Sequence, residues 1–155
     1  MGTAFREFLH EPVRLHDKLT RLEIQIAELE SLCSKQTVNY EAVGGFSGGG
    51  DAKDGALAAL TDLKIEWASC RRERVWAATA LIKFLNRVRE SDKINGHRDA
   101  TLLLQRHLYE LPWNRVYENL EAMGYKCCGL RTVTNWHRRA LERAERVWEA
   151  EYGAD

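Results

Sequence analysis

The chain has 155 residues, of which 45% are apolar and 30% are charged. This size and composition are typical of one compact domain, or of a small domain with an extended arm. Lysine and arginine together number 23, as do aspartate and glutamate, so the formal net charge is zero. A uniformly basic protein that coats nucleic acid is therefore excluded, and only a local charge bias can direct a partner.

No apolar run approaches the roughly 20 residues of a membrane span, and the N-terminus lacks the apolar stretch of a secretory signal. We therefore expect a cytoplasmic protein that makes no membrane contact. The cysteines are too few and too irregularly spaced for a disulfide framework, so reduced thiols are expected. They are Cys33, Cys70, Cys127 and Cys128.

The sequence predicts an all-α protein, because only two prolines occur and no segment shows sustained β-branched alternation. The first expected helix has a narrow apolar seam with alternating spacings of four and three residues, which is typical of a helix that packs along another helix. The seam consists of Leu15, Leu19, Leu22, Ile26, Leu29 and Cys33. A longer amphipathic helix follows, with apolar positions from Leu57 to Val88.

Six of the eleven glycines lie in the segment that joins these two helices. With so little apolar side chain to offset the entropy of ordering, the segment is predicted to be a flexible loop at about residues 36–55. Residues 1–93 are thus expected to form a long antiparallel helical hairpin that resembles a coiled coil. The same seams can instead pair between chains, which would make a homodimer.

Three shorter helices are predicted after the hairpin, at about residues 98–110, 112–124 and 130–151. Pro112 favours a sharp break before the second of them, and Gly124 suits a left-handed stop at its end. The third helix has a regular inward-facing set, namely Val133, Trp136, Ala140, Ala144 and Val147. Two short helices joined by a glycine-containing turn are typical of a helix-turn-helix, so residues 94–155 are predicted to bind DNA.

The outer face of the third helix has the side chains that reading DNA requires. Arg131 and Asn135 lie opposite Val133, near the start of the helix. Arginine can bridge O6 and N7 of guanine, and asparagine can bridge N6 and N7 of adenine, so these two residues are predicted to contact bases. The arginines further along the helix are predicted to follow the phosphates. They are Arg138, Arg139, Arg143 and Arg146.

The local charge supports DNA binding and adds Lys126 to the DNA-binding candidates. Residues 126–146 have a net charge of +4, although the whole chain is neutral. An arginine-rich amphipathic helix can also be a solvated face with ion pairs along it, and charge alone does not separate these readings.

Three stretches together resemble a known family: Leu108–Val116, Met123–Tyr125 and Arg131–Leu141. They are similar to the sigma-factor region-four-like helix-turn-helix of phage late-gene transcription regulators of the RinA and ArpU kind. Members commonly place a helical hairpin before this module, so the resemblance covers most of the chain. It implies that first-turn residues read bases, which here are Arg131, Thr132, Thr134 and Asn135.

The chain departs from the family in the turn before the third helix, which is longer here by the segment 126–129. The resemblance implies a phage or prophage protein that acts in the bacterial cytoplasm on double-stranded DNA. RNA polymerase is then a further candidate partner.

Other candidate sites are weaker. At about 100° per residue, His137 lies on the same side of the third helix as Val133, so it is predicted to be a packed histidine. The adjacent pair Cys127 and Cys128 lacks the spacing of a zinc site, and the glycine-rich segment lacks the Lys-Ser/Thr of a phosphate loop. No catalytic arrangement or cofactor fingerprint occurs, so neither an enzyme nor a cofactor is expected. The alternative function is a helical adaptor, or a phage structural or DNA-packaging subunit, in which the hairpin drives oligomerisation.

Overall fold

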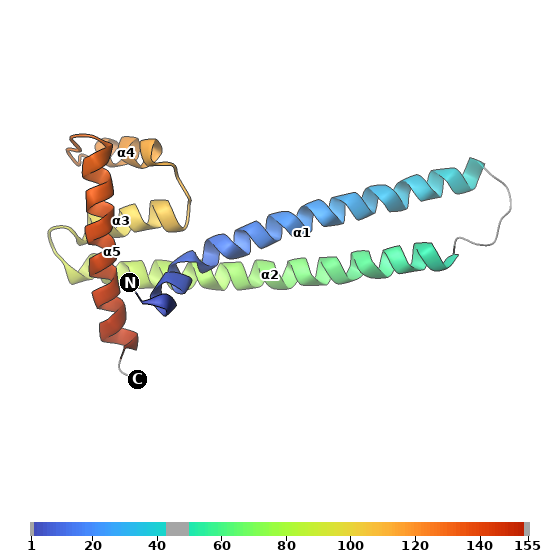
Figure 1. Cartoon of the computed structure of the whole chain (residues 1–155), viewed down its shortest axis with the longest axis horizontal. Helices are drawn as coiled ribbons and strands as arrows, with labels where there is room; N and C mark the ends of the chain where they lie inside the picture. The colour runs from blue at the N-terminus through green and yellow to red at the C-terminus, as the bar shows by residue number, and fades with distance from the viewer. Residues whose placement is uncertain (1, 43–49, 154–155) are drawn as a thin grey trace. The chain divides into compact units, whose positions relative to one another are not determined.

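The chain is helical throughout the part that the structure describes. This computed structural model describes residues 2–42 and 50–153, with side chains for residues 2–35 and 54–153. The helices are α1 (Thr3–Ala42), α2 (Gly50–Ser91), α3 (Gly96–His107), α4 (Trp113–Ala122) and α5 (Leu130–Tyr152), as labelled in Figure 1. No strand occurs among these residues, so the all-α prediction is confirmed.

The two long helices extend further than the sequence predicts. Helix α1 continues to Ala42 and α2 begins at Gly50, so both ends of the predicted loop at 36–55 are helical. The segment 36–42 contains neither glycine nor proline, and 50–55 contains no proline, so neither end holds a strong helix breaker. The centre of the predicted loop, 43–49, lies outside the described residues.

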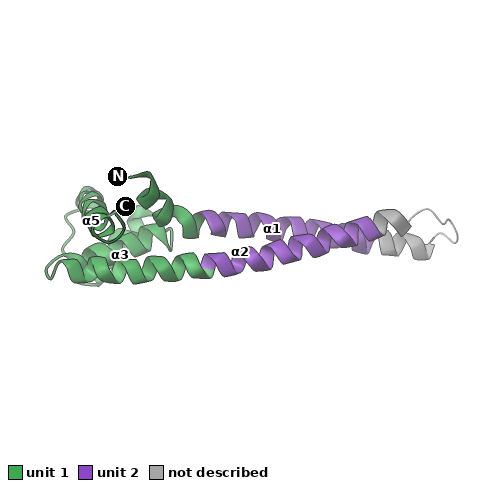
Figure 2. Cartoon of the chain, turned by 90° about the horizontal axis from the view of Figure 1, so that it is seen from below, with its two compact units in different colours: residues 1–13, 75–155 green, residues 14–74 purple. Residues whose placement is uncertain are grey.

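The chain divides into two compact units, which Figure 2 colours separately. Unit 1 contains Met1–Val13 and Val75–Asp155, and unit 2 contains Arg14–Arg74. The predicted division at residue 93 differs from this grouping, because both ends of the expected hairpin region pack into the core of unit 1. Among the described residues, no helix is both long enough and apolar enough to cross a membrane.

In unit 2, a segment of α1 packs against a segment of α2 along the predicted seam. Leu15, Leu19 and Leu22 are buried, and the Cys70 thiol lies 3.6 Å from the Leu15 carbonyl oxygen. Two ion pairs join the segments further along, Lys18 with Glu66 at 2.9 Å and Glu30 with Lys64 at 2.8 Å. Residue numbers in α2 fall as those in α1 rise, so the two segments run antiparallel.

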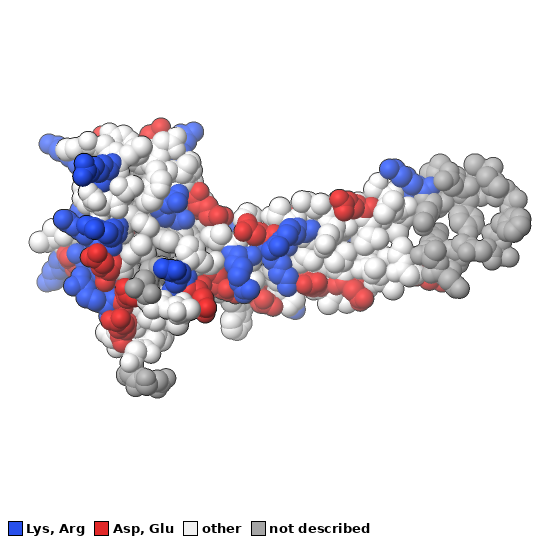
Figure 3. Space-filling model, in the orientation of Figure 1, with Lys and Arg blue, Asp and Glu red and all other residues white. Residues whose placement is uncertain are grey.

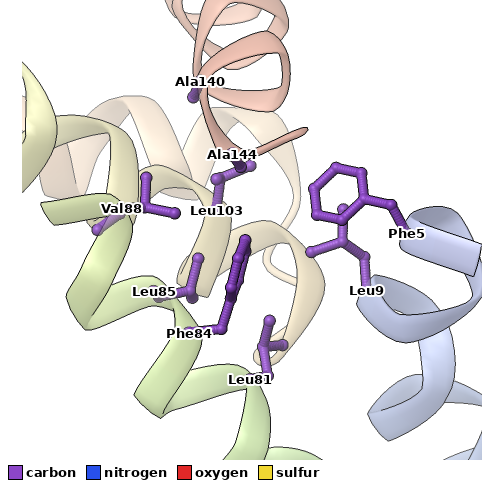
Figure 4. Packing of buried hydrophobic residues seen from close by; sticks show 10 residues of the cluster. Phe5, Leu9, Leu81, Phe84, Leu85, Val88, Leu103, Ala140 and Ala144 are labelled. Atoms are coloured by element: carbon purple, nitrogen blue, oxygen red, sulfur yellow. The ribbon is translucent and has the colours of Figure 1, made fainter. Parts of the chain in front are cut away.

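Unit 1 has a first core to which four helices contribute (Figure 4). Its buried members are Phe5, Leu9, Leu81, Phe84, Leu85, Val88, Ala100, Leu103, Ala140 and Ala144. Phe84 of α2 meets the ring of Phe5 edge-on, with ring centroids 5.9 Å apart, and the Trp148 ring of α5 at 5.8 Å. The first turns of α1 and the last turns of α2 are thus fixed against α3 and α5 by large apolar side chains.

A second core in unit 1 holds α3, α4 and α5 together. Its buried members are Leu102, Val116, Leu120, Cys127 and Val133. The partly buried rings of Trp113, Tyr117, Tyr125 and Trp136 pack around it. Of the predicted apolar positions of α4, Val116 and Leu120 are fully buried, whereas Met123 is 47% exposed, because α4 ends at Ala122 and Met123 belongs to the turn.

Candidate nucleic-acid interface

The turn between α4 and α5 is anchored at both ends. Gly124 adopts φ 89°, and the Tyr125 N–H donates to the Leu120 carbonyl at 3.0 Å, so the predicted left-handed stop is confirmed. The Glu121 carboxylate then accepts the backbone N–H of Cys127 at 2.8 Å. A hydrogen bond and burial therefore fix Cys127, one of the extra residues of this turn.

Cys127 acts as an apolar anchor within that turn. Its side chain is buried, and its thiol lies 3.4 Å from the Tyr125 carbonyl oxygen, to which it donates. Burial raises the pKa of the Cys127 thiol, which favours the protonated form that this bond needs. Its neighbour Cys128 is exposed. The two thiols therefore have different environments, and packing accounts for the buried one.

Helix α5 presents most of the predicted DNA-binding residues to solvent. Six are exposed: Lys126 in the turn, and Arg131, Thr134, Asn135, Arg138 and Arg139 on the helix. On the opposite side Val133, Ala140 and Ala144 are fully buried, as the angular analysis predicts. Figure 3 shows lysine and arginine side chains gathered over the α3–α5 part of unit 1, with acidic side chains among them.

The two threonines of the first turn are less available than the other candidates. Thr132 is half-buried, and the Thr134 hydroxyl donates to the Arg131 carbonyl at 3.0 Å. Bonding of this kind, back to the preceding helical turn, uses the hydroxyl proton within the helix. Thr134 can therefore offer a partner only an acceptor, whereas Arg131 and Asn135 keep their full donor sets exposed.

Arg143, which the sequence predicts to contact the DNA phosphates, is partly buried and paired within the fold. Its side chain is only 19% exposed, and its guanidinium pairs with Asp99 and with Asp92, the latter at 2.8 Å. Two carboxylates of the same chain therefore occupy this arginine. The helical angle places Arg143 nearer the edge of the core than Arg139, and it faces acidic residues of two other segments.

Asp99 of α3 is the centre of this ion network and is fully buried. One of its carboxylate oxygens accepts from Nε and Nη2 of Arg98, at 3.0 and 2.8 Å, and the other accepts from Arg143. The guanidinium of Arg98 also lies over the Trp136 ring of α5, 4.4 Å from its centroid. Asp99 is thus linked to α5 at two positions separated by seven residues.

Asp92, just after α2, supports the same network. Its Oδ1 accepts the backbone N–H groups of Ile94 and Asn95, at 2.8 and 3.0 Å, while its Oδ2 pairs with Arg143. The N–H groups of Asn95 and Ile94 lower the pKa of the Asp92 carboxyl, and the Arg143 charge lowers it further. The carboxylate form is therefore favoured, and the turn into α3 is tied to α5.

A pair of histidines joins α3 to α5 near the second core. The Nε2 atoms of His107 and His137 are 3.1 Å apart, with ring planes within 17° of each other. The Trp113 ring of α4 meets His137 edge-on, with ring centroids 5.1 Å apart. The prediction that His137 packs inside the fold is therefore confirmed.

Both histidines of this pair are neutral near pH 7. Burial lowers the pKa of His107 to about 3 and that of His137 to about 4, with the Arg106 charge contributing to both shifts. Since both rings are neutral, one Nε2–H donates and the other Nε2 accepts. Within the described part of the chain, no group of three or more His, Cys, Asp or Glu side chains is placed to hold a metal ion.

An open cleft of about 340 Å³ lies beside the ion network, between the end of α2 and the C-terminal half of α5. It is lined by Ser91, Asp92, Arg143, Arg146, Val147 and Ala150. Arg146 is exposed there, on the same outer side of α5 as Arg139.

The residues that sequence reasoning missed are Arg98, Asp99 and His107. Asp99 precedes Leu103 by four residues, which puts a carboxylate on the inward side of α3, and this is the signal that was available. Its arginine partner on α5 follows 44 positions later in the chain. No local pattern identifies such a pair.

The chain matches no protein-family model, and neither a curated protein nor a solved structure shows significant similarity to it.

Proposed function

We propose that this chain is a sequence-specific DNA-binding transcriptional regulator in which α4, its turn and α5 form a helix-turn-helix. In this proposal α5 enters the major groove and reads bases with Arg131 and Asn135. The protein is then a phage or prophage regulator of the RinA and ArpU kind, acting in the cytoplasm of the bacterial host. Residues 1–93 form the accompanying hairpin, and RNA polymerase is a candidate second partner.

The exposed first turns of α5 are the observation that carries this proposal. Arg131 and Asn135 are exposed there, while Val133 on the opposite side is fully buried against α3 and α4. One face of the helix is thus packed against the rest of unit 1, and the opposite face exposes hydrogen-bond donors. Base reading in a groove requires this arrangement. Lys126, Arg138 and Arg139 flank this pair and can neutralise phosphates.

Selection of binding sites from random double-stranded DNA, followed by mobility-shift assays, tests the proposal. Wild type should enrich a defined sequence. Arg131→Ala and Asn135→Ala should each lose about 1–3 kcal/mol of preference for that sequence over its variants. Arg72→Ala is the matched control, because Arg72 is exposed on α2 and belongs to unit 2.

Two results would contradict the proposal. A wild type that enriches no sequence is not a sequence-specific regulator. Variants that are folded but keep the full preference for the selected sequence would show that α5 is not the recognition helix. The longer turn at 126–129 would then be the first feature to test as the cause of a different docking on DNA.

The second candidate function is a helical adaptor, or a phage structural or DNA-packaging subunit. It is favoured by large apolar side chains that remain exposed in unit 2, which suit contacts between subunits. They are Ile24, Leu32, Leu57 and Ile65, each more than 40% exposed. Light scattering separates the two functions, because a regulator should be a monomer or dimer, whereas a packaging subunit should form a larger ring.

A further inference from the structure

We infer that Asp99 and Arg143 are positioning residues, which fix the orientation of α5 so that Arg131 and Asn135 can discriminate bases. The inference rests on the proposed function and deepens it. It separates the arginines of α5 into two groups: the exposed ones, which are available to DNA, and Arg143, which lies at the edge of the core and pairs with carboxylates of this chain.

The first support is the geometry of the attachment. Asp99 is fully buried and uses both carboxylate oxygens, one for Arg98 and one for Arg143. Arg98 in turn covers the Trp136 ring. Positions 136 and 143 are two turns apart on one side of α5, so this single carboxylate is linked to the helix at two points along its axis.

The second support is the small size of the residues of α5 that are fully buried over this stretch. Ala140 and Ala144 have no exposed surface in the first core, whereas the larger side chains of Leu141 and His137 beside them are only partly buried. Alanines allow close approach of the helices, but they interdigitate little and so restrict sliding and rotation weakly. Directional, charge-assisted hydrogen bonds restrict these motions more strongly.

Base reading is sensitive to such motions. A bidentate contact needs both hydrogen bonds at the right length and angle, so a helix that rotates slightly loses discrimination before it loses its attraction to phosphates. Removing the network should therefore lower the preference for the selected sequence more than the affinity for DNA in general.

The test compares binding to the selected sequence and to unrelated DNA of equal length, below the unfolding transition of each variant. We expect Asp99→Asn and Arg143→Met to lower the ratio of the two affinities by about tenfold. Arg143→Lys keeps one ion pair and should fall between Arg143→Met and wild type. Arg139→Ala, the matched loss of one charge from the exposed face, should weaken both affinities and leave the ratio unchanged.

A merely structural role predicts lower stability with an unchanged ratio in the folded protein, and that result would overturn the inference while leaving the proposed function intact. The amide hydrogen exchange rate of the first three turns of α5 can be measured in the absence of DNA. This rate should be higher in Asp99→Asn than in wild type. Unchanged exchange would also contradict the inference. A wild type that prefers no sequence overturns the proposed function, and the inference with it.

Discussion

At the residue scale, neighbouring arginines of α5 have different surroundings. Arg139 is exposed, whereas Arg143 is mostly covered and holds two carboxylates. A surface arginine contributes little to stability, but removing one partner of a buried ion pair leaves a charge that solvent cannot reach. Two arginines of one helix therefore differ in role. The surroundings of each determine whether its charge stabilises the fold or remains available to a partner.

This difference gives a stability prediction. Arg143→Met should lower the free energy of unfolding of unit 1 by about 3 kcal/mol, because Asp99 keeps only Arg98 as a partner. Arg139→Met should change it by less than about 0.5 kcal/mol. Urea unfolding followed by tryptophan fluorescence measures both. Equal effects of the two substitutions would contradict the ion network.

The histidine pair gives a prediction of pH dependence. In the folded chain the pKa values of His107 and His137 are about 3 and about 4, below the ordinary 6.5. The unfolded chain therefore binds more protons between about pH 4 and pH 6.5, and stability falls as the pH is lowered through this range. From pH 7 to pH 5 we expect a loss of about 2–4 kcal/mol.

Substitutions separate this effect from other titrations. His107→Gln and His137→Gln should each reduce the loss between pH 7 and pH 5, as measured by urea unfolding at both values. His97→Gln is the control, because His97 is exposed at the start of α3. If the His107 and His137 variants lose as much stability as wild type, the buried neutral pair is not the cause.

At the scale of elements, the sequence correctly predicts the features that depend on residues close together in the chain. The stop at Gly124, the inward position of Val133 and the exposure of Arg131 follow from helical periodicity and a glycine signal. The Asp99–Arg143 pair does not, because it joins positions that only the packing of α3 on α5 brings together. The extension of α1 to Ala42 is missed because composition alone does not fix where a helix ends.

Two glycines in helices give opposite predictions for the same substitution. In Gly96→Ala the added methyl group would collide with the backbone carbonyl of Arg89, where the start of α3 lies against α2. A carbonyl held in a helix cannot move aside, so we expect a loss of at least about 2 kcal/mol. In Gly55→Ala the methyl group enters open space, and higher helix propensity should stabilise the chain by about 0.5–1 kcal/mol. Thermal unfolding of both variants should show shifts of opposite sign.

At the scale of the whole molecule, the two units bury their apolar surface to different degrees. Unit 1 has two cores of buried side chains, and segments from both ends of the chain contribute to the first of them. In unit 2 the seam is well covered near Leu15, Leu19 and Leu22, but Ile26 and Leu29 are only half-buried. Two helices alone cannot enclose a seam of this length, so the second half of unit 2 has apolar surface that a partner can cover.

This partial coverage leads to the last prediction, which concerns oligomeric state. We expect a homodimer whose mass depends on concentration, in which unit 2 supplies the contact, because under the proposed function two copies would gain from reading two half-sites. Ile65→Lys puts a charge on a side chain that is 63% exposed in unit 2, and it should shift the equilibrium toward monomer. The matched control is Ile94→Lys, at a side chain that is 87% exposed in unit 1, and it should leave the mass unchanged. Light scattering over a range of concentrations measures both variants. A monomer at every concentration would remove the dimer from the proposal, and a ring of many subunits would favour the adaptor or packaging function instead.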